Sequence, residues 1–136
     1  MSYAVAAAFQ SAVYVALASD VTLQGLVGGA VFDALPSGTP PPLYVSLGPE
    51  TVTDASDKTG SGTWHKFTVT VMSDAPGFAE AKTVAGRICD ILVGAELVLT
   101  RGRLVGLSFE RASAARTDSD NGRKIDLRFK ARIEDS

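Results

Sequence analysis

The chain has 136 residues, of which 46% are hydrophobic and 21% are charged, so it is long enough for one folded domain and too apolar to be disordered. Its single cysteine, Cys89, excludes an internal disulfide and a cysteine metal cluster, which fits a reducing compartment. The net charge of −2 argues against general, charge-driven binding to nucleic acid. We therefore treat residues 1–136 as a single domain.

The charges are unevenly distributed along the chain. No lysine or arginine precedes Lys58, and the acidic residues before it are Asp20, Asp33, Glu50, Asp54 and Asp57. The segment from Arg101 to Arg132 carries nine basic residues and four acidic ones. Oppositely charged ends suit subunits that meet head to tail. A solvated sheet face that carries arginines is the alternative interpretation.

The first expected element is an amphipathic helix within residues 3–18, whose apolar residues recur with a period of 3.6. This segment resembles a signal peptide, but no positive charge precedes it and Gln10 and Ser11 interrupt it. It is also too short to span a bilayer, which takes about 20 residues. The sequence therefore predicts a helix packed on a core, and no membrane.

Short segments follow. Asp20 is expected to cap a helix over residues 21–27, because an aspartate side chain accepts hydrogen bonds from the free amides of the following turn. A short extended piece at 30–34 precedes a connector at 35–42, whose prolines exclude helix and central strand. Alternating apolar residues predict a half-buried strand over 43–47.

The middle of the chain predicts a loop, a strand and a helix. Residues 50–62 are mostly Thr, Ser, Asp and Gly, and we expect a long loop that is mobile in an isolated subunit and ordered by a neighbour. Residues 63–72 alternate strictly, which predicts a strand with His65 near its end. Apolar residues at helical spacing predict the main helix over residues 77–93, packed across one face of the sheet.

The last third predicts a long β-hairpin with strands over residues 104–111 and 124–133. The apolar residues of both strands are odd-numbered. A two-residue turn would pair odd with even positions and split the apolar face. A three-residue loop at 120–122 pairs odd with odd and places Phe109 near Ile133, and we prefer this register.

No catalytic, cofactor or metal site is visible in the sequence. His65 is the only histidine, Cys89 lies in an apolar helix, and no serine occupies a G-x-S-x-G elbow. The residues at 118–122 suit a turn better than a calcium loop, because the glycine comes one place early. Composition and spacing predict an α+β domain for binding or assembly: a four-stranded, mainly antiparallel sheet with a main helix on one face, an N-terminal helix and a long C-terminal β-hairpin.

A series of short motifs runs through nearly the whole chain. In order they are Ala18-Ser19-Asp20, Leu26-Val27-Gly28-Gly29, Val31-Phe32-Asp33, Leu43-Tyr44-Val45, Asp57-Lys58-Thr59-Gly60-Ser61-Gly62, the strand from Thr63 to Ser73, the helix ending at Leu92 and the arginine-rich hairpin. In this order and spacing they resemble the small tail-completion, or tail terminator, proteins of long-tailed bacteriophages and gene transfer agents. Met72 departs from the pattern, since the family usually has an aromatic residue there.

The resemblance implies a virion structural protein without enzymatic activity or cofactor. It implies a homo-oligomeric ring, typically a hexamer, that assembles in the bacterial cytoplasm and then sits in the tail neck. There it would cap the tail tube protein and join it to the head-tail connector or stopper, while DNA passes through unread. The alternatives are another neck or minor tail ring component, or a small oligomeric α+β enzyme or ligand-binding module.

The basic hairpin is expected to carry part of the subunit contact, because its charged residues lie opposite its apolar ones. Exposed ion pairs contribute only about 0–1 kcal/mol each, so apolar area must supply most of the energy while charges set orientation. Positive charge in the channel would retard DNA by binding its phosphates, which places the arginines at the interface instead. The expected interface residues are Asp20, Asp33, Asp54, Trp64, Met72, Arg111, Arg128 and Arg132.

Overall fold

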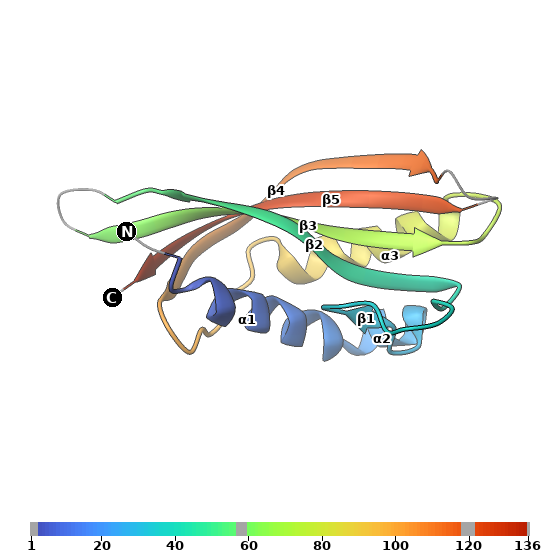
Figure 1. Cartoon of the computed structure of the whole chain (residues 1–136), viewed down its shortest axis with the longest axis horizontal. Coiled ribbons are helices and arrows are strands. Elements are labelled where there is room, and N and C mark those ends of the chain that lie inside the picture. The colour runs from blue at the N-terminus through green and yellow to red at the C-terminus, as the bar shows by residue number, and fades with distance from the viewer. Residues whose placement is uncertain (1–2, 57–59, 118–121, 136) are drawn as a thin grey trace.

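The computed structural model describes residues 3–56, 60–117 and 122–135. Within them the elements follow in the order α1 (Ala6–Ala18), α2 (Val21–Val27), β1 (Val31–Phe32), β2 (Leu43–Asp54), β3 (Ser61–Ser73), α3 (Ala79–Leu92), β4 (Arg103–Arg116) and β5 (Arg123–Asp135). The strands form one sheet in the order β1-β2-β3-β5-β4. The helices lie together on one side of this sheet, and the long, twisted strands extend past them (Figure 1).

The helices begin and end close to where the sequence predicts. The side chain of Asp20 caps α2 by accepting a hydrogen bond from the Leu23 amide at 2.8 Å. Gly28 ends that helix in the left-handed region, at φ 61°, which glycine adopts without the steric cost that other residues have. The apolar stripes of α1 and α3 both face the sheet.

The core is the layer between the helices and the sheet. The odd-numbered residues of β3 and β5 point into it, as predicted, and meet one apolar stripe from each long helix. Phe9 of α1 packs edge-on against Phe67 at 5.2 Å between ring centroids, and Phe67 stacks on Phe129 at 5.5 Å. Fully burying one such side chain is worth about 1.5–3 kcal/mol, so this layer supplies most of the stability.

The expected four-stranded, mainly antiparallel sheet is wrong in two respects, because the sheet has five strands and is mixed. Val31 and Phe32 form β1, which pairs in parallel with Val45 and Ser46 of β2. A two-residue strand is too short to show an alternating pattern, so the sequence identifies only an extended piece there.

The predicted loop over residues 50–62 is largely strand. β2 continues to Asp54 and pairs with β3 from Glu50↔Phe67 to Asp54↔Thr63, after a bulge between Leu47 and Glu50. β-branched side chains at 51–53 favour the extended backbone. Two of the three are threonines, because this part of the β2–β3 pair extends past the helices and is not covered by them. The expected mobility concerned this whole segment, of which residues 57–59 lie outside the described part.

The predicted hairpin register is correct in parity only from Gly106 to Phe109, between two bulges; it is wrong in position there, and on either side of the bulges odd residues pair with even ones. Odd residues pair with odd ones at Leu107↔Ala131 and Phe109↔Phe129, so Phe109 lies opposite Phe129 and not near Ile133. Two bulges in β4 shift the register, and the strands pair as far as Arg116↔Arg123. The connection is therefore longer than the predicted three-residue loop, whose residues 120 and 121 lie outside the described part.

Candidate assembly surface

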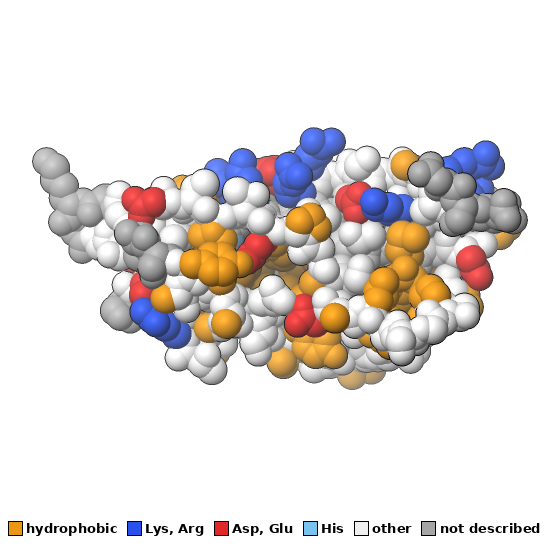
Figure 2. Space-filling model, in the orientation of Figure 1, with side chains coloured by type: hydrophobic (Ala, Val, Ile, Leu, Met, Phe, Trp, Pro, Cys, Tyr) orange, Lys and Arg blue, Asp and Glu red, His pale blue; other side chains and the backbone are white. Residues whose placement is uncertain are grey.

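One face of the sheet carries no helix and presents five basic side chains from β3 and β5. We call it the open face and define it by the residues of β3 and β5 that point away from the helices: Trp64, Lys66, Thr68, Thr70, Met72, Lys124, Asp126, Arg128, Lys130, Arg132 and Glu134. Lysine and arginine side chains gather along the upper rim in Figure 2, where Figure 1 places β4 and β5. A one-sided antiparallel sheet can be stable with this face in water, so the open face is available for contacts.

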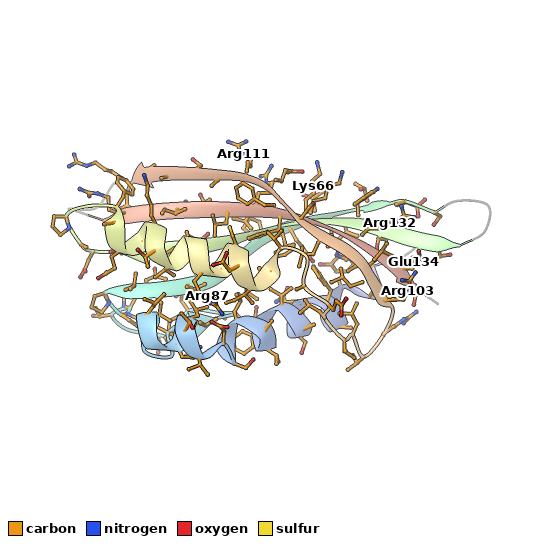
Figure 3. The ribbon with its side chains drawn as sticks, turned by 180° about the vertical axis from the view of Figure 1, so that it is seen from behind. Lys66, Arg87, Arg103, Arg111, Arg132 and Glu134 are labelled. Atoms are coloured by element: carbon orange, nitrogen blue, oxygen red, sulfur yellow. The ribbon has the colours of Figure 1, made fainter. Side chains whose placement is uncertain are left out.

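Several of its charges are already paired within the chain. Lys66 reaches over β5 to Glu110 of β4 at 3.6 Å, and Figure 3 shows Lys66 and Arg111 pointing away from the helices. Lys124 lies 3.5 Å from Asp126, which also accepts a hydrogen bond from Thr70 at 2.8 Å. These pairs leave an excess of positive charge on the rest of the open face.

Arg111 and Arg128 form part of that excess. They lie directly opposite each other on β4 and β5, and both are exposed. Among the residues that the structure describes, neither makes an ion pair. Like charges at directly opposed positions destabilise a strand pair, so an anionic group of another molecule would relieve this repulsion.

Trp64 is the large aromatic side chain of the open face and lies near one end of it. Its ring lies 4.1 Å from the Lys130 ammonium and 5.4 Å from the Arg132 guanidinium, which are cation–π distances. Arg132 also donates a hydrogen bond to the Ala55 carbonyl at 2.9 Å. Arg132 and Trp64 thus hold the far end of the β2–β3 ribbon against β5.

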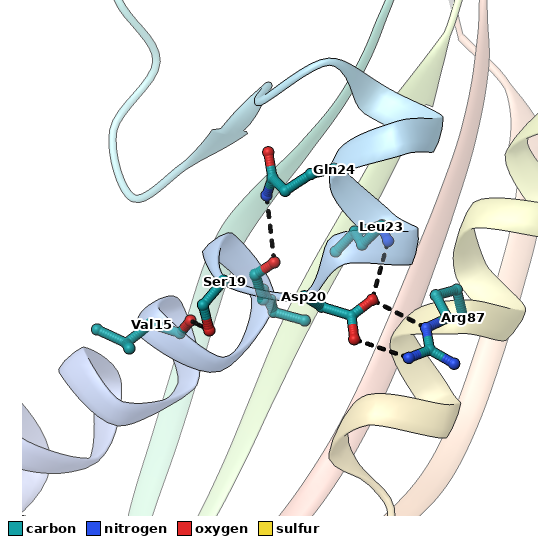
Figure 4. Close-up of polar contacts among 7 residues, drawn as sticks. Val15, Ser19, Asp20, Leu23, Gln24 and Arg87 are labelled. Carbon is teal, nitrogen blue, oxygen red and sulfur yellow. Dashed lines mark hydrogen bonds and ion pairs between the residues drawn. The ribbon is translucent and has the colours of Figure 1, made fainter.

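Asp20, one of the acidic residues expected at the interface, is engaged inside the chain. Its carboxylate accepts two hydrogen bonds from Arg87 of α3, from Nε at 2.9 Å and from Nη2 at 2.7 Å, as well as the cap bond (Figure 4). The Arg87 hydrogen bonds, with the Leu23 amide, lower the pKa of Asp20 to about 2. Asp20 therefore joins α2 to α3.

The other two acidic residues lie near the β1–β2 edge of the sheet. Asp33 accepts a hydrogen bond from Gln10 of α1 at 2.5 Å and is exposed. Asp54 ends β2, and the Ser56 hydroxyl donates to it at 2.8 Å, which lowers the pKa of Asp54. Both lie on the opposite edge of the sheet from the arginines of β4.

Met72 is half-buried and packs against the core at the end of β3. The expected interface residues therefore fall into three groups: Trp64, Met72, Arg111, Arg128 and Arg132 on the open face or its edge; Asp33 and Asp54 on the opposite edge; and Asp20 with a role inside the chain.

His65 is not at a strand end, as the sequence suggested, but fully buried beneath α1. Its Nε2 lies 2.9 Å from the Thr63 hydroxyl, while Nδ1 faces a Glu50 carboxylate oxygen at 4.0 Å. Desolvation lowers the pKa of His65, although Glu50 opposes the shift. The alternating pattern of residues 63–72 already places His65 on the inner face, and α1 covers it there, with the Phe9 ring 5.4 Å from the His65 ring between centroids.

The described residues hold no group of three or more His, Cys, Asp or Glu side chains placed to bind a metal ion. Burial raises the pKa of the Cys89 thiol, with a smaller contribution from Asp90, which disfavours the reactive thiolate. In the same part of the chain no single helix is long and apolar enough to cross a membrane. The pair α1 and α2, bent by 73°, is long and apolar enough when the two are taken together, by length and composition alone.

Sequence reasoning missed the edge formed by β4. The predicted strand stops at Arg111, but β4 continues to Arg116, and residues 108–116 are all exposed. Alanine and serine dominate the added stretch, and they give no alternation of apolar and polar residues. Its signal in the sequence is the absence of proline and glycine between Ser108 and Arg116.

These features define an α+β protein with helices on one side of a mixed sheet and an open, charged face on the other. The chain belongs to the family of tail completion protein gp17, which matches residues 11–134. A chain in the solved structure titled "Virion of native gene transfer agent (GTA) particle" is 58% identical, with a TM-score of 0.92 over 98% of this chain and 99% of that one. No curated protein matches the chain. The family establishes a structural role in a phage-like tail.

Proposed function

We propose that several copies of this chain close into a ring that terminates the tail tube and joins it to the head connector or stopper. The observation that carries the proposal is the 58% identity, over 98% of this chain, to a chain of a gene transfer agent virion. In this role the protein is not an enzyme, assembles in the bacterial cytoplasm and lets DNA pass through the ring.

The charge distribution supports subunits that meet head to tail. The edge made by β1 and β2 carries Asp33, Glu50 and Asp54, and no basic residue precedes Lys58. The other edge carries Arg103, Arg111 and Arg116 of β4. A heterologous contact between two different surfaces generates a closed ring when the rotation per subunit closes.

Within the ring, Arg111, Arg128 and Arg132 are proposed to orient a neighbour that presents acids such as Asp33 and Asp54, with Trp64 and Met72 supplying apolar area. Asp20 is paired with Arg87 inside the chain, so of the acidic residues expected at the interface it is the least available to a neighbour. The same assignment keeps these arginines out of the channel, where they would bind the phosphates of passing DNA.

The test is to measure the mass of the purified chain by light scattering, alone and with isolated tail tubes, and to image both by negative-stain microscopy. We expect rings that bind one end of each tube. Reversal of Arg128 and Arg132 to glutamate should reduce the ring mass, most of all at low salt, because exposed charges are screened at high salt. A single-subunit mass under every condition, with bare tube ends, would refute the function.

A further inference from the structure

The open face is hollowed at the end of the sheet where β2 begins and β4 ends. Two adjoining hollows there share Tyr44 and Met72, and together we call them the open-face groove. Its residues form two rows across β2, β3, β5 and β4: Tyr44, Met72, Lys124 and Ala115 in one row, and Ser46, Thr70, Asp126 and Ser113 in the other. Figure 2 shows hydrophobic side chains at the surface of this end of the molecule, where Figure 1 places β1 and the first half of β2. Tyr44 and Met72 thus give the groove an apolar part.

The groove is bounded on the β2 side and open on the β4 side. The prolines at 40–42, in the connector before β2, line it on the first side. On the second side lie the small, exposed side chains of Ser113 and Ala115. Because β4 is an outermost strand of the sheet, a segment that approaches from beyond this edge passes over two small side chains before it reaches Met72.

The entrance of the groove at β4 is basic. Arg116 lines the groove, and Arg111 lies two residues before Ser113 on the same strand. Neither arginine forms an ion pair with any residue that the structure describes. Farther inside, Lys124 and Asp126 are paired with each other. The groove therefore favours a segment that carries a negative charge close to an apolar side chain.

The segment that follows β1 has this composition. Residues 33–36 are Asp, Ala, Leu and Pro, all of them are exposed, and Leu35 keeps 51% of its surface exposed. Gln10 donates a hydrogen bond to Oδ1 of Asp33, and a carboxylate accepts several hydrogen bonds, so Asp33 can also pair with an arginine. An exposed leucine two residues from an exposed aspartate matches the apolar part and the basic entrance of the groove.

This segment and the groove lie at the same height along the strands. β1 pairs Phe32 with Ser46, and the row of Ser46 continues through β3 and β5 to Ser113. β1 and β4 are the two outermost strands, so in a head-to-tail ring whose axis runs along the strands, the β1 edge of one copy meets the β4 edge of the next. Rotation about that axis keeps every residue at its height, which brings residues 33–36 to the entrance of the neighbour's groove.

We infer that residues 33–36 of one copy dock in the open-face groove of the next, with Leu35 against Tyr44 and Met72 and with Asp33 beside the arginines at the entrance. The inference rests on the proposed ring, and it names the segment by which one subunit holds its neighbour. Burial of the leucine contributes more than the charges, because exposed ion pairs contribute little. The charges of Asp33 and the arginines set the direction in which the segment enters.

Cross-linking of assembled rings tests this docking directly. In a Cys89→Ala background, Ala34→Cys chains are mixed with Ser113→Cys chains, and the rings are treated with a short bismaleimide. Ala34 precedes the docked leucine and Ser113 lies at the entrance, so the mixture should give a covalent dimer that neither variant gives alone. When Thr83→Cys, at an exposed position of α3 on the helical side, replaces Ser113→Cys, the dimer should stay at background.

The outcomes of this experiment separate the docking from the ring. Rings that form without the dimer would overturn the docking and leave the ring proposal standing. Absence of rings from the unsubstituted chain, under every condition, would overturn both.

A substitution of Leu35 tests the apolar contact. Leu35→Ser should weaken the contact between subunits by about tenfold or more, because burial of a leucine side chain is worth at least that factor. Val98→Ser is the matched control, since Val98 is 91% exposed in the connection between α3 and β4 and lies outside the groove. Light scattering over a range of concentrations measures both, and equal ring yields would contradict the role of Leu35.

A charge placed at the entrance tests the groove itself. Ala115→Glu should obstruct the entrance and repel Asp33, so the rings should be lost while the subunit keeps its circular dichroism spectrum. Ala112→Glu is the control on the same strand: Ala112 is equally exposed but pairs with the inward-facing Leu127. If Ala115→Glu rings keep their mass and fail only to bind tail tubes, the groove receives the tube protein instead, and the inference is wrong.

Discussion

Asp20 and Arg87 lie 67 residues apart in the sequence and form a bidentate ion pair that joins the start of α2 to the middle of α3. One carboxylate thereby performs two tasks, capping a helix and accepting a guanidinium. Planar, two-point pairing of arginine with a carboxylate is stronger and more directional than a single contact.

Substitution of Asp20 should separate these two tasks. Asp20→Asn keeps a good cap but loses the charge, whereas Asp20→Ala loses both, so we expect the midpoint of thermal unfolding to fall by a few degrees in the first and further in the second. Because the pKa of Asp20 is about 2 and its ordinary value is 3.8, the contribution is full above about pH 4 and is lost as the pH falls through 2. Equal midpoints for both variants at pH 7 would argue against the cap.

Buried His65 should make folding sensitive to mild acid. Its pKa is lowered by desolvation, so the unfolded chain takes up a proton at a higher pH than the folded one, and stability falls as the pH drops below about 6.5. Denaturant unfolding between pH 7 and pH 5 should show this loss. His65→Gln, which cannot ionise, should flatten the profile, and an unchanged slope in that variant would exclude His65 as the cause.

Ile88 anchors α3 on the sheet, where its side chain is fully buried. Ile88→Ala should lower the free energy of unfolding by about 2–5 kcal/mol, through lost burial and the cavity that remains. Val98→Ala, at an exposed site, should change it by less than about 0.5 kcal/mol. Urea unfolding followed by circular dichroism measures both, and a small effect at Ile88 would mean that the helix is held in some other way.

Arg111 and Arg128 face each other on β4 and β5. A change of charge at Arg128 should therefore alter the stability of the isolated subunit and the stability of the ring in opposite directions. Arg128→Glu turns a repulsive cross-strand pair with Arg111 into an attractive one, so it should stabilise the isolated subunit by about 0.2–1 kcal/mol. The same change should weaken the ring if Arg128 faces a neighbour's acids. Unfolding of the monomer at low concentration and light scattering at high concentration give the two readings.

The sequence predicts those parts of the fold that repeat a local pattern. The stripe at Phe9, Val13 and Leu17 and the alternation from Thr63 to Met72 each record one buried face, and both elements are as expected. No pattern in the sequence marks the bulge before Glu50 or the bulges in β4, because a bulge inserts one residue without changing the local composition. Their positions depend on what lies opposite, which is set by the whole sheet.

The same distinction holds for the candidate assembly surface, part of which can be predicted from the sequence and part of which cannot. The charge asymmetry and the basic face of β5 can be read from spacing, since Lys124 to Glu134 alternate. The engagement of Asp20 by Arg87 cannot, because only the packing of α2 on α3 brings them together. The outermost position of β4 is equally invisible in the sequence, since strand order determines which strand lies at the edge of the sheet.

The opposite charges of the two sheet edges also bear on how assembly of the proposed ring could fail. A ring built from one contact between two different surfaces, as proposed above, contains no stop signal, because only the rotation between successive copies returns the last copy to the first. A substitution that changes this rotation by a few degrees, without weakening the contact, would turn closed rings into open helical filaments. In the proposed ring, the number of subunits would therefore be set by the rotation at each contact and not by the strength of that contact.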